Sequence, residues 1–93
     1  MSEPDASKGS GQAPPAEFLT LVSTLAAQAS IQLGIVANPM TKKVQKDLRG
    51  ARFAIDMLAM LERKTQGNLT PEEERVLSHI LADVRLRFVD ASK

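Results

Sequence analysis

Cysteine, tryptophan and tyrosine are absent from the 93-residue sequence. Without cysteine the chain can form no disulfide, no thiolate metal site and no cysteine nucleophile. With three phenylalanines as its only aromatic residues, it offers few rings on which nucleic-acid bases could stack. Its single histidine, His79, is too few for a histidine metal site. We expect His79 to be an ordinary helix residue, able to pair with Asp83 four positions later.

The sequence also lacks an excess of charge of either sign. Twelve Lys and Arg residues and eleven Asp and Glu residues give a formal net charge of +1. A near-neutral chain attracts no polyanion through its overall field, so nucleic-acid binding would need a local basic patch. The N-terminal stretch MSEPDASKGSGQAPPAE carries acidic residues and Pro and Gly, where a secretory signal has a basic segment and then an apolar one. We therefore expect a cytoplasmic protein.

Residues 1–15 combine Ser, Gly, Pro, Ala and charged residues without apolar periodicity. Such a composition buries too little surface to offset chain entropy, which predicts a disordered tail before a helical domain over residues 16–93. A first helix is expected over residues 16–34, ending at Gly34. Apolar residues recur there at steps of three and four, at Phe18, Leu21, Val22, Leu25, Ala29 and Leu33.

The same region raises the alternative of a membrane span, because FLTLVSTLAAQASIQLGIV contains nineteen residues without a charge. Four polar residues at four-residue steps form a stripe along it, namely Thr20, Thr24, Gln28 and Gln32. A lipid-facing helix has no reason to carry such a stripe. We therefore expect a soluble helix and no membrane partner.

A second helix is expected over residues 44–66, apolar over more of its circumference than one neighbouring helix can cover. Its first apolar stripe consists of Val44, Leu48, Ala51, Ile55 and Leu58. A second stripe beside it consists of Phe53, Met57, Met60 and Leu61. A chain this short has too little of its own to cover both stripes. The second stripe is the predicted interface of a homodimer or other homo-oligomer.

The stretch KTQGNLTPEEE, residues 64–74, contains signals that end one helix and begin another. Gly67 suits the left-handed conformation that follows a helix, and Asn68 tolerates the same geometry. Asn68 also begins a formal N-glycosylation acceptor, Asn-Leu-Thr. The turn interpretation is favoured because no secretory signal is expected and a proline follows the threonine directly.

Thr70 is expected to cap a third helix over residues 71–90, with Pro71 at its first position and Glu73 completing a capping box. Its apolar face would consist of Val76, Leu77, Ile80, Leu81, Val84 and Phe88. The short connection predicts an antiparallel hairpin of the second and third helices. Two exposed ion pairs are expected across it, Glu62 with Arg75 and Arg63 with Glu74. The expected fold is thus an all-α, three-helix domain with a disordered N-terminal tail.

The segment KKVQKDLRGAR holds five basic residues against one acidic residue, namely Lys42, Lys43, Lys46, Arg49 and Arg52. Most are expected along one side of the second helix, where positive charge opposes the dipole of the helix N-terminus and calls for compensation. The alternatives are a solvated face and a nucleic-acid or anion site. Asp56 is expected on a polar exterior stripe between Arg52 and Arg63, with an interfacial ion pair as the alternative.

Three segments of the chain together resemble the small bacterial domain-of-unknown-function family eighteen-forty-four. They are LGIVANP, ARFAIDMLAMLERKTQGNLTPEE and LADVRLRFV. The resemblance covers the chain from Phe18 to Val89. It implies a bacterial protein with a helical core and a variable N-terminal tail. It supplies no activity, cofactor or catalytic residue.

No paired acid and base, nucleophile with its base, glycine-rich phosphate loop or metal-ligand cluster is visible in the sequence. The run of three glutamates at residues 72–74 does not converge, because consecutive residues point in different directions on a helix. We therefore predict a non-enzymatic, self-associating helical interaction module without cofactor or metal. The alternative is a nucleic-acid or anion-binding protein that uses the basic segment.

Overall fold

A computed structural model of the chain describes residues 16–93. The predicted disordered tail, residues 1–15, lies outside the described residues. Three α-helices follow one another, α1 (Phe18–Gln32), α2 (Leu48–Lys64) and α3 (Pro71–Ala91), and residues 16–93 contain no strand. The predicted all-α, three-helix fold is confirmed.

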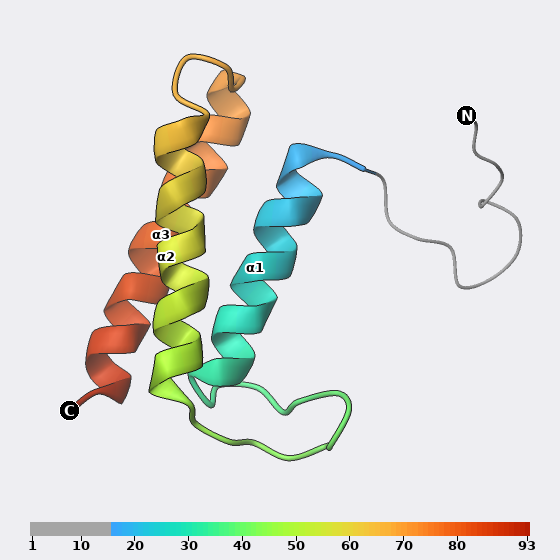
Figure 1. Cartoon of the computed structure of the whole chain (residues 1–93), viewed down its shortest axis with the longest axis vertical. Helices are drawn as coiled ribbons and strands as arrows, with labels where there is room; N and C mark the ends of the chain where they lie inside the picture. Colours follow the sequence, from blue (N-terminus) through green and yellow to red (C-terminus); the bar gives the residue numbers. More distant parts are fainter. Residues whose placement is uncertain (1–15) are drawn as a thin grey trace, which may run out of the picture.

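The three helices run up and down beside one another, and each packs against the other two (Figure 1). α2 and α3 form the predicted antiparallel hairpin, and α1 runs antiparallel to α2 (Figure 1). The α1–α2 loop, residues 33–47, lies at the opposite end of the bundle from the α2–α3 turn (Figure 1).

α1 spans Phe18–Gln32 and is thus two residues shorter at each end than the predicted 16–34, but it does terminate at Gly34, through a Schellman motif. The backbone N–H of Ile35 donates to the Ser30 carbonyl at 3.0 Å, and the N–H of Gly34 donates to the Ile31 carbonyl at 3.1 Å. Both bonds require the chain to turn in the left-handed region, where Gly34 has φ +78°. The motif satisfies carbonyls that would otherwise have no partner in the last turn.

α2 differs from the prediction at both ends: it begins at Leu48 instead of residue 44, and ends at Lys64 instead of residue 66. Asp47 explains the start, because its Oδ1 accepts the Gly50 N–H at 3.1 Å and caps the helix. The Asp47 N–H also donates to the Gln32 carbonyl at 2.7 Å, which ties the incoming loop to the end of α1. Val44 is therefore not part of the apolar stripe of α2, and its side chain is 60% exposed.

The core lies where the three helices meet. Its buried apolar residues are Val22, Ala29, Leu33, Ala51, Ala54, Ile55, Leu58, Leu77, Leu81 and Val84. From Ala51 onward, the first apolar stripe predicted for the second helix is the side of α2 that faces this core. Several core residues are alanines, which lets the helices approach closely. A Cβ atom added to Gly50 would lie 2.7 Å from the Oε1 atom of Gln32 on α1.

Candidate interaction surface

The second apolar stripe of α2 lies outside the core. Phe53 is 67% exposed, and Met57, Met60 and Leu61 are each partly exposed. Within residues 16–93, none of the four belongs to the buried core or to the apolar side chains packed directly against it. The structure therefore leaves the predicted interface residues partly open to solvent.

This stripe lies on the side of α2 that turns towards α1. Gly50, which contacts Gln32 of α1, is seven residues before Met57 and eleven before Leu61, so the three share one side of the helix. On α1, Leu21 precedes Gln32 by eleven residues, shares its side and is 46% exposed. We call these five side chains the apolar face: Leu21, Phe53, Met57, Met60 and Leu61. None of them is charged.

The predicted polar stripe of α2 runs beside the apolar face, since Asp56 is three residues after Phe53 and four before Met60. Nε of Arg52 lies 3.6 Å from Oδ1 of Asp56, and both side chains are about two-thirds exposed, at 66% and 65%. An i,i+4 pair so open to solvent contributes only about 0.3–0.5 kcal/mol. The solvated-exterior interpretation of Asp56 is thus the one that the single chain shows, and the Arg52–Asp56 pair borders the apolar face.

The five basic residues are exposed, but they are not brought onto one side of a helix. Lys42, Lys43 and Lys46 precede α2, and only Arg49 and Arg52 belong to it. The predicted helical alignment is therefore wrong, because Asp47 caps α2 before the lysines could join it. The Asp47 carboxylate also supplies the negative charge that the helix N-terminus favours.

The side chain of Lys46 contacts the C-terminal end of α3. Its ammonium group donates to the Ala91 carbonyl at 3.1 Å, across forty-five positions of sequence. Ala91 is the last residue of α3, where carbonyl groups lack intrahelical partners and a cation complements the helix dipole. Lys46 thus ties the α1–α2 loop to the end of α3.

The start of α3 has the predicted capping box. Oγ1 of Thr70 accepts the Glu73 N–H at 3.1 Å, and Oε1 of Glu73 accepts the Thr70 N–H at 2.8 Å. Pro71 occupies the first helical position, where a missing N–H leaves no bond unmade. Backbone geometry accounts for these three residues without a ligand.

Gly67 has the expected positive φ, +86°, but not directly after the helix. Because α2 ends at Lys64, Gly67 lies in a turn closed by the Asn68 N–H, which donates to the Thr65 carbonyl at 2.9 Å. Positive φ at the third position of such a turn is typical of type II and favours glycine. Asn68 itself does not take a positive φ.

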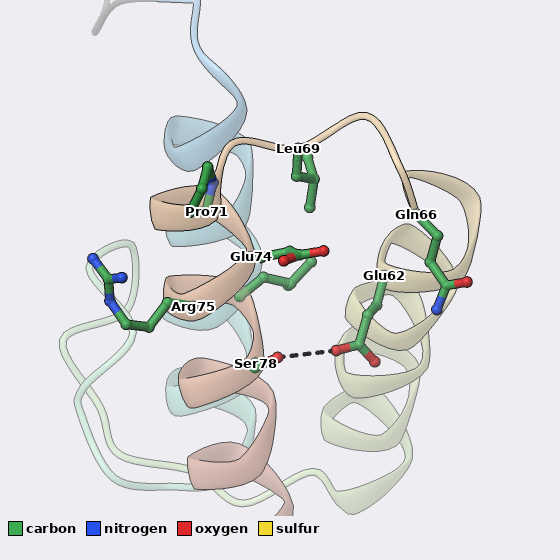
Figure 2. Close-up of a pocket in the computed structure, with 8 residues that line it drawn as sticks. Glu62, Gln66, Leu69, Pro71, Glu74, Arg75 and Ser78 are labelled. Atoms are coloured by element: carbon green, nitrogen blue, oxygen red, sulfur yellow. Dashed lines mark hydrogen bonds between the residues drawn. The ribbon is translucent and has the colours of Figure 1, made fainter.

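A groove of about 410 Å³ lies between α2 and α3 beside this turn (Figure 2). The Ser78 hydroxyl donates to Oε2 of Glu62 at 3.4 Å across it, while Arg75 points away from Glu62 (Figure 2). The predicted ion pairs of Glu62 with Arg75 and Arg63 with Glu74 are therefore wrong. Residues 65–70 lie outside both helices, whereas only residues 67–70 were predicted to do so. The longer turn changes which residues of α2 and α3 face each other.

His79 does not pair with Asp83. The Asp83 carboxylate instead accepts Nε of Arg87 at 3.0 and 3.2 Å through its two oxygens. The guanidinium group is always charged and has a fork of donors that matches a carboxylate, which makes it the stronger partner. In residues 16–93, no group of three His, Cys, Asp or Glu side chains could hold a metal ion.

Four apolar residues of the α1–α2 loop are strongly exposed, which was not predicted: Ile35, Val36, Met40 and Val44. The available signal was the position of these residues in a segment that contains proline and has no helical periodicity. None of the helices in residues 16–93 has the length and apolar character of a membrane span.

Residues 15–90 match the family model described as domain of unknown function (DUF1844), and this range contains α1, α2, both connections and all of α3 except Ala91. No curated protein and no solved structure matches the chain. Its bacterial origin and cytoplasmic location stay predictions.

Proposed function

Since the chain belongs to a family of unknown function (DUF1844) whose description names no activity, we infer its role from its own surface. It is a non-enzymatic interaction module that self-associates, as a homodimer, through the apolar face. That it is not an enzyme stays a prediction.

The apolar face on α2 is the observation that carries this proposal. Phe53, Met57, Met60 and Leu61 gather on one side of a helix whose other side already supplies the core. Met57, Met60 and Leu61 are already partly buried, whereas Phe53 is 67% exposed and has the most surface left to cover. Fully burying a large apolar side chain contributes about 1.5–3 kcal/mol, which is an upper limit for each of these residues.

A second copy of the same face is the partner that its composition favours. In a twofold dimer one patch meets its own copy, so charges near the axis would face like charges. The five side chains of the apolar face are uncharged, and the carboxylate of Asp56 at its edge is paired with Arg52. Its two methionines are flexible and adapt to an irregular opposing surface, and Phe53 is the aromatic anchor that interfaces favour.

Charged residues flank the apolar face without interrupting it. Arg49 lies one turn before Phe53, and Lys64 one turn after Met60, and both are exposed. An apolar centre with a polar rim is the usual anatomy of a protein interface. The rim would keep the free protomer soluble, and the centre would supply the affinity.

Sedimentation equilibrium of the full chain at low and at high salt tests the proposal. We expect a mass of two protomers that persists at high salt, because an apolar interface is not screened. Phe53→Asp should give a monomer that still folds, since Phe53 is largely exposed in the single chain. Met57→Asp tests a second position of the face.

Leu86→Asp is the matched control, because Leu86 is 69% exposed on α3 and lies outside the apolar face. The Leu86→Asp variant should have the same solution mass as the wild type, that of two protomers. Circular dichroism should show that every variant is still helical. A wild type that stays monomeric at high concentration would overturn the proposal. Dissociation by Leu86→Asp but not by Phe53→Asp would move the interface to α3.

A further inference from the structure

The α1–α2 loop concentrates exposed apolar surface. Of the eight large apolar residues that are strongly exposed in the described chain, four lie in residues 33–47. They are Ile35 at 43%, Val36 at 45%, Val44 at 60% and Met40 at 88%. The loop projects from one end of the bundle, away from the α2–α3 turn (Figure 1). Ile35 lines a small pocket against the end of α3, whereas Met40 is the most exposed of the four. We call residues 36–44 of the loop the tip.

The tip has a defined backbone structure. The N–H of Asn38 donates to the Lys43 carbonyl at 2.9 Å, and the N–H of Lys42 donates to the Asn38 carbonyl at 2.7 Å. Oδ1 of Asn38 accepts the Met40 N–H at 2.7 Å, and Oγ1 of Thr41 accepts the Lys43 N–H at 3.3 Å. Because most of its donors are satisfied internally, the tip can leave bulk water at a lower cost than an open loop.

Lysines surround this apolar tip. Lys42 and Lys43 are exposed, and neither takes part in an ion pair within residues 16–93. Lys42 keeps a φ of +63°, the only positive φ of a non-glycine residue in that part of the chain. The one acidic residue of the loop, Asp47, is engaged by the Gly50 N–H. The outer surface of the loop thus combines apolar side chains with uncompensated positive charge.

We propose that the α1–α2 loop docks the protein reversibly onto an anionic lipid surface. Met40 enters the boundary between headgroups and acyl chains, and Lys42 and Lys43 contact the lipid phosphates. Apolar insertion together with basic residues is the combination that holds a peripheral protein on an anionic membrane. The proposal does not depend on self-association. It departs from the expectation of no membrane partner, which considered only a spanning helix.

A nucleic acid fits this surface less well than a lipid. Phosphate contacts would use the lysines, but the tip has no aromatic side chain on which bases could stack. Met40, the most exposed large apolar residue, would then gain nothing from binding. On a lipid surface, both the apolar and the basic residues of the loop are used.

Flotation of the full chain with vesicles tests the proposal, using phosphatidylcholine alone or mixed with phosphatidylglycerol. We expect binding to the mixed vesicles only. The double variant Lys42→Glu with Lys43→Glu, and separately Met40→Asp, should each lower the partition coefficient at least about tenfold. Arg75→Glu and Leu86→Asp are the matched controls, an exposed basic residue and an exposed apolar residue on α3, outside the loop, and should bind like the wild type.

A tryptophan probe gives a second readout in a chain that has no tryptophan of its own. Emission from Met40→Trp should shift to the blue with mixed vesicles, and emission from Leu86→Trp should not. No binding to mixed vesicles, or full binding by Met40→Asp, would overturn the proposal. It would also be overturned by a shift of random RNA or DNA that depends on Lys42 and Lys43 while the mixed vesicles stay unbound.

Discussion

Asp47 and Thr70 each use a side-chain oxygen to accept a backbone N–H in the first turn of a helix, Asp47 from Gly50 and Thr70 from Glu73. These N–H groups have no partner within their own helix, so the side chain replaces the missing carbonyl. Each residue therefore decides where a helix begins. Thr70 acts with a reciprocal bond from Glu73, whereas Asp47 directly follows Lys46, whose charge would otherwise add to the positive end of α2.

Thr70→Ala tests the cap of α3. It removes the Oγ1 acceptor and should lower the free energy of unfolding by about 1 kcal/mol. Urea denaturation followed by circular dichroism measures the change. Thr70→Ser is the control, because it keeps the hydroxyl group and should cost much less. Equal losses for Ala and Ser would mean that the methyl group of Thr70, and not its hydroxyl, stabilises the turn.

α2 has two apolar sides, one that packs in the core and one that is partly exposed. Ala54, Ile55 and Leu58 face the core, where they meet α1 and α3. Phe53 and Met57 lie on the other apolar side and stay partly open to solvent. Substitution of the core residues should lower the free energy of unfolding. Substitution of the exposed apolar residues should instead weaken the association of two protomers.

A pair of Leu→Ala substitutions separates the core from the surface. Leu58 is fully buried, at 0% exposure, whereas Leu86 on α3 is 69% exposed. We expect Leu58→Ala to lower the free energy of unfolding by about 2–5 kcal/mol, because it removes buried methyl groups and leaves a cavity. Leu86→Ala should change it by less than about 0.5 kcal/mol. Urea titrations of both variants give the comparison, and similar losses would contradict the placement of the core.

At the scale of the whole molecule, the small core suits a protein that is completed by association. Large apolar side chains remain exposed on α1, α2, α3 and the α1–α2 loop. Folding and association should therefore be linked.

This linkage predicts that the melting temperature rises with protein concentration. A partner that binds only the folded chain stabilises it by mass action, so more protein means a higher melting temperature. Differential scanning calorimetry over a hundredfold concentration range would show the increase for the wild type. Phe53→Asp should melt at one temperature at all concentrations. A wild-type melting temperature independent of concentration would argue against a folded dimer.

The sequence by itself determined the features that depend on neighbours three or four residues apart. The helix end at Gly34 and the cap at Thr70 follow from local hydrogen bonds, and the core side of α2 follows from helical periodicity. Only the tertiary structure decided which residues far apart in the sequence contact each other, because several donors and acceptors could have formed such contacts. The bond of the Asp47 N–H to Gln32 and that of Lys46 to Ala91 hold residues 42–47 outside α2. Packing of the α2–α3 hairpin, in turn, placed Ser78 and not Arg75 opposite Glu62.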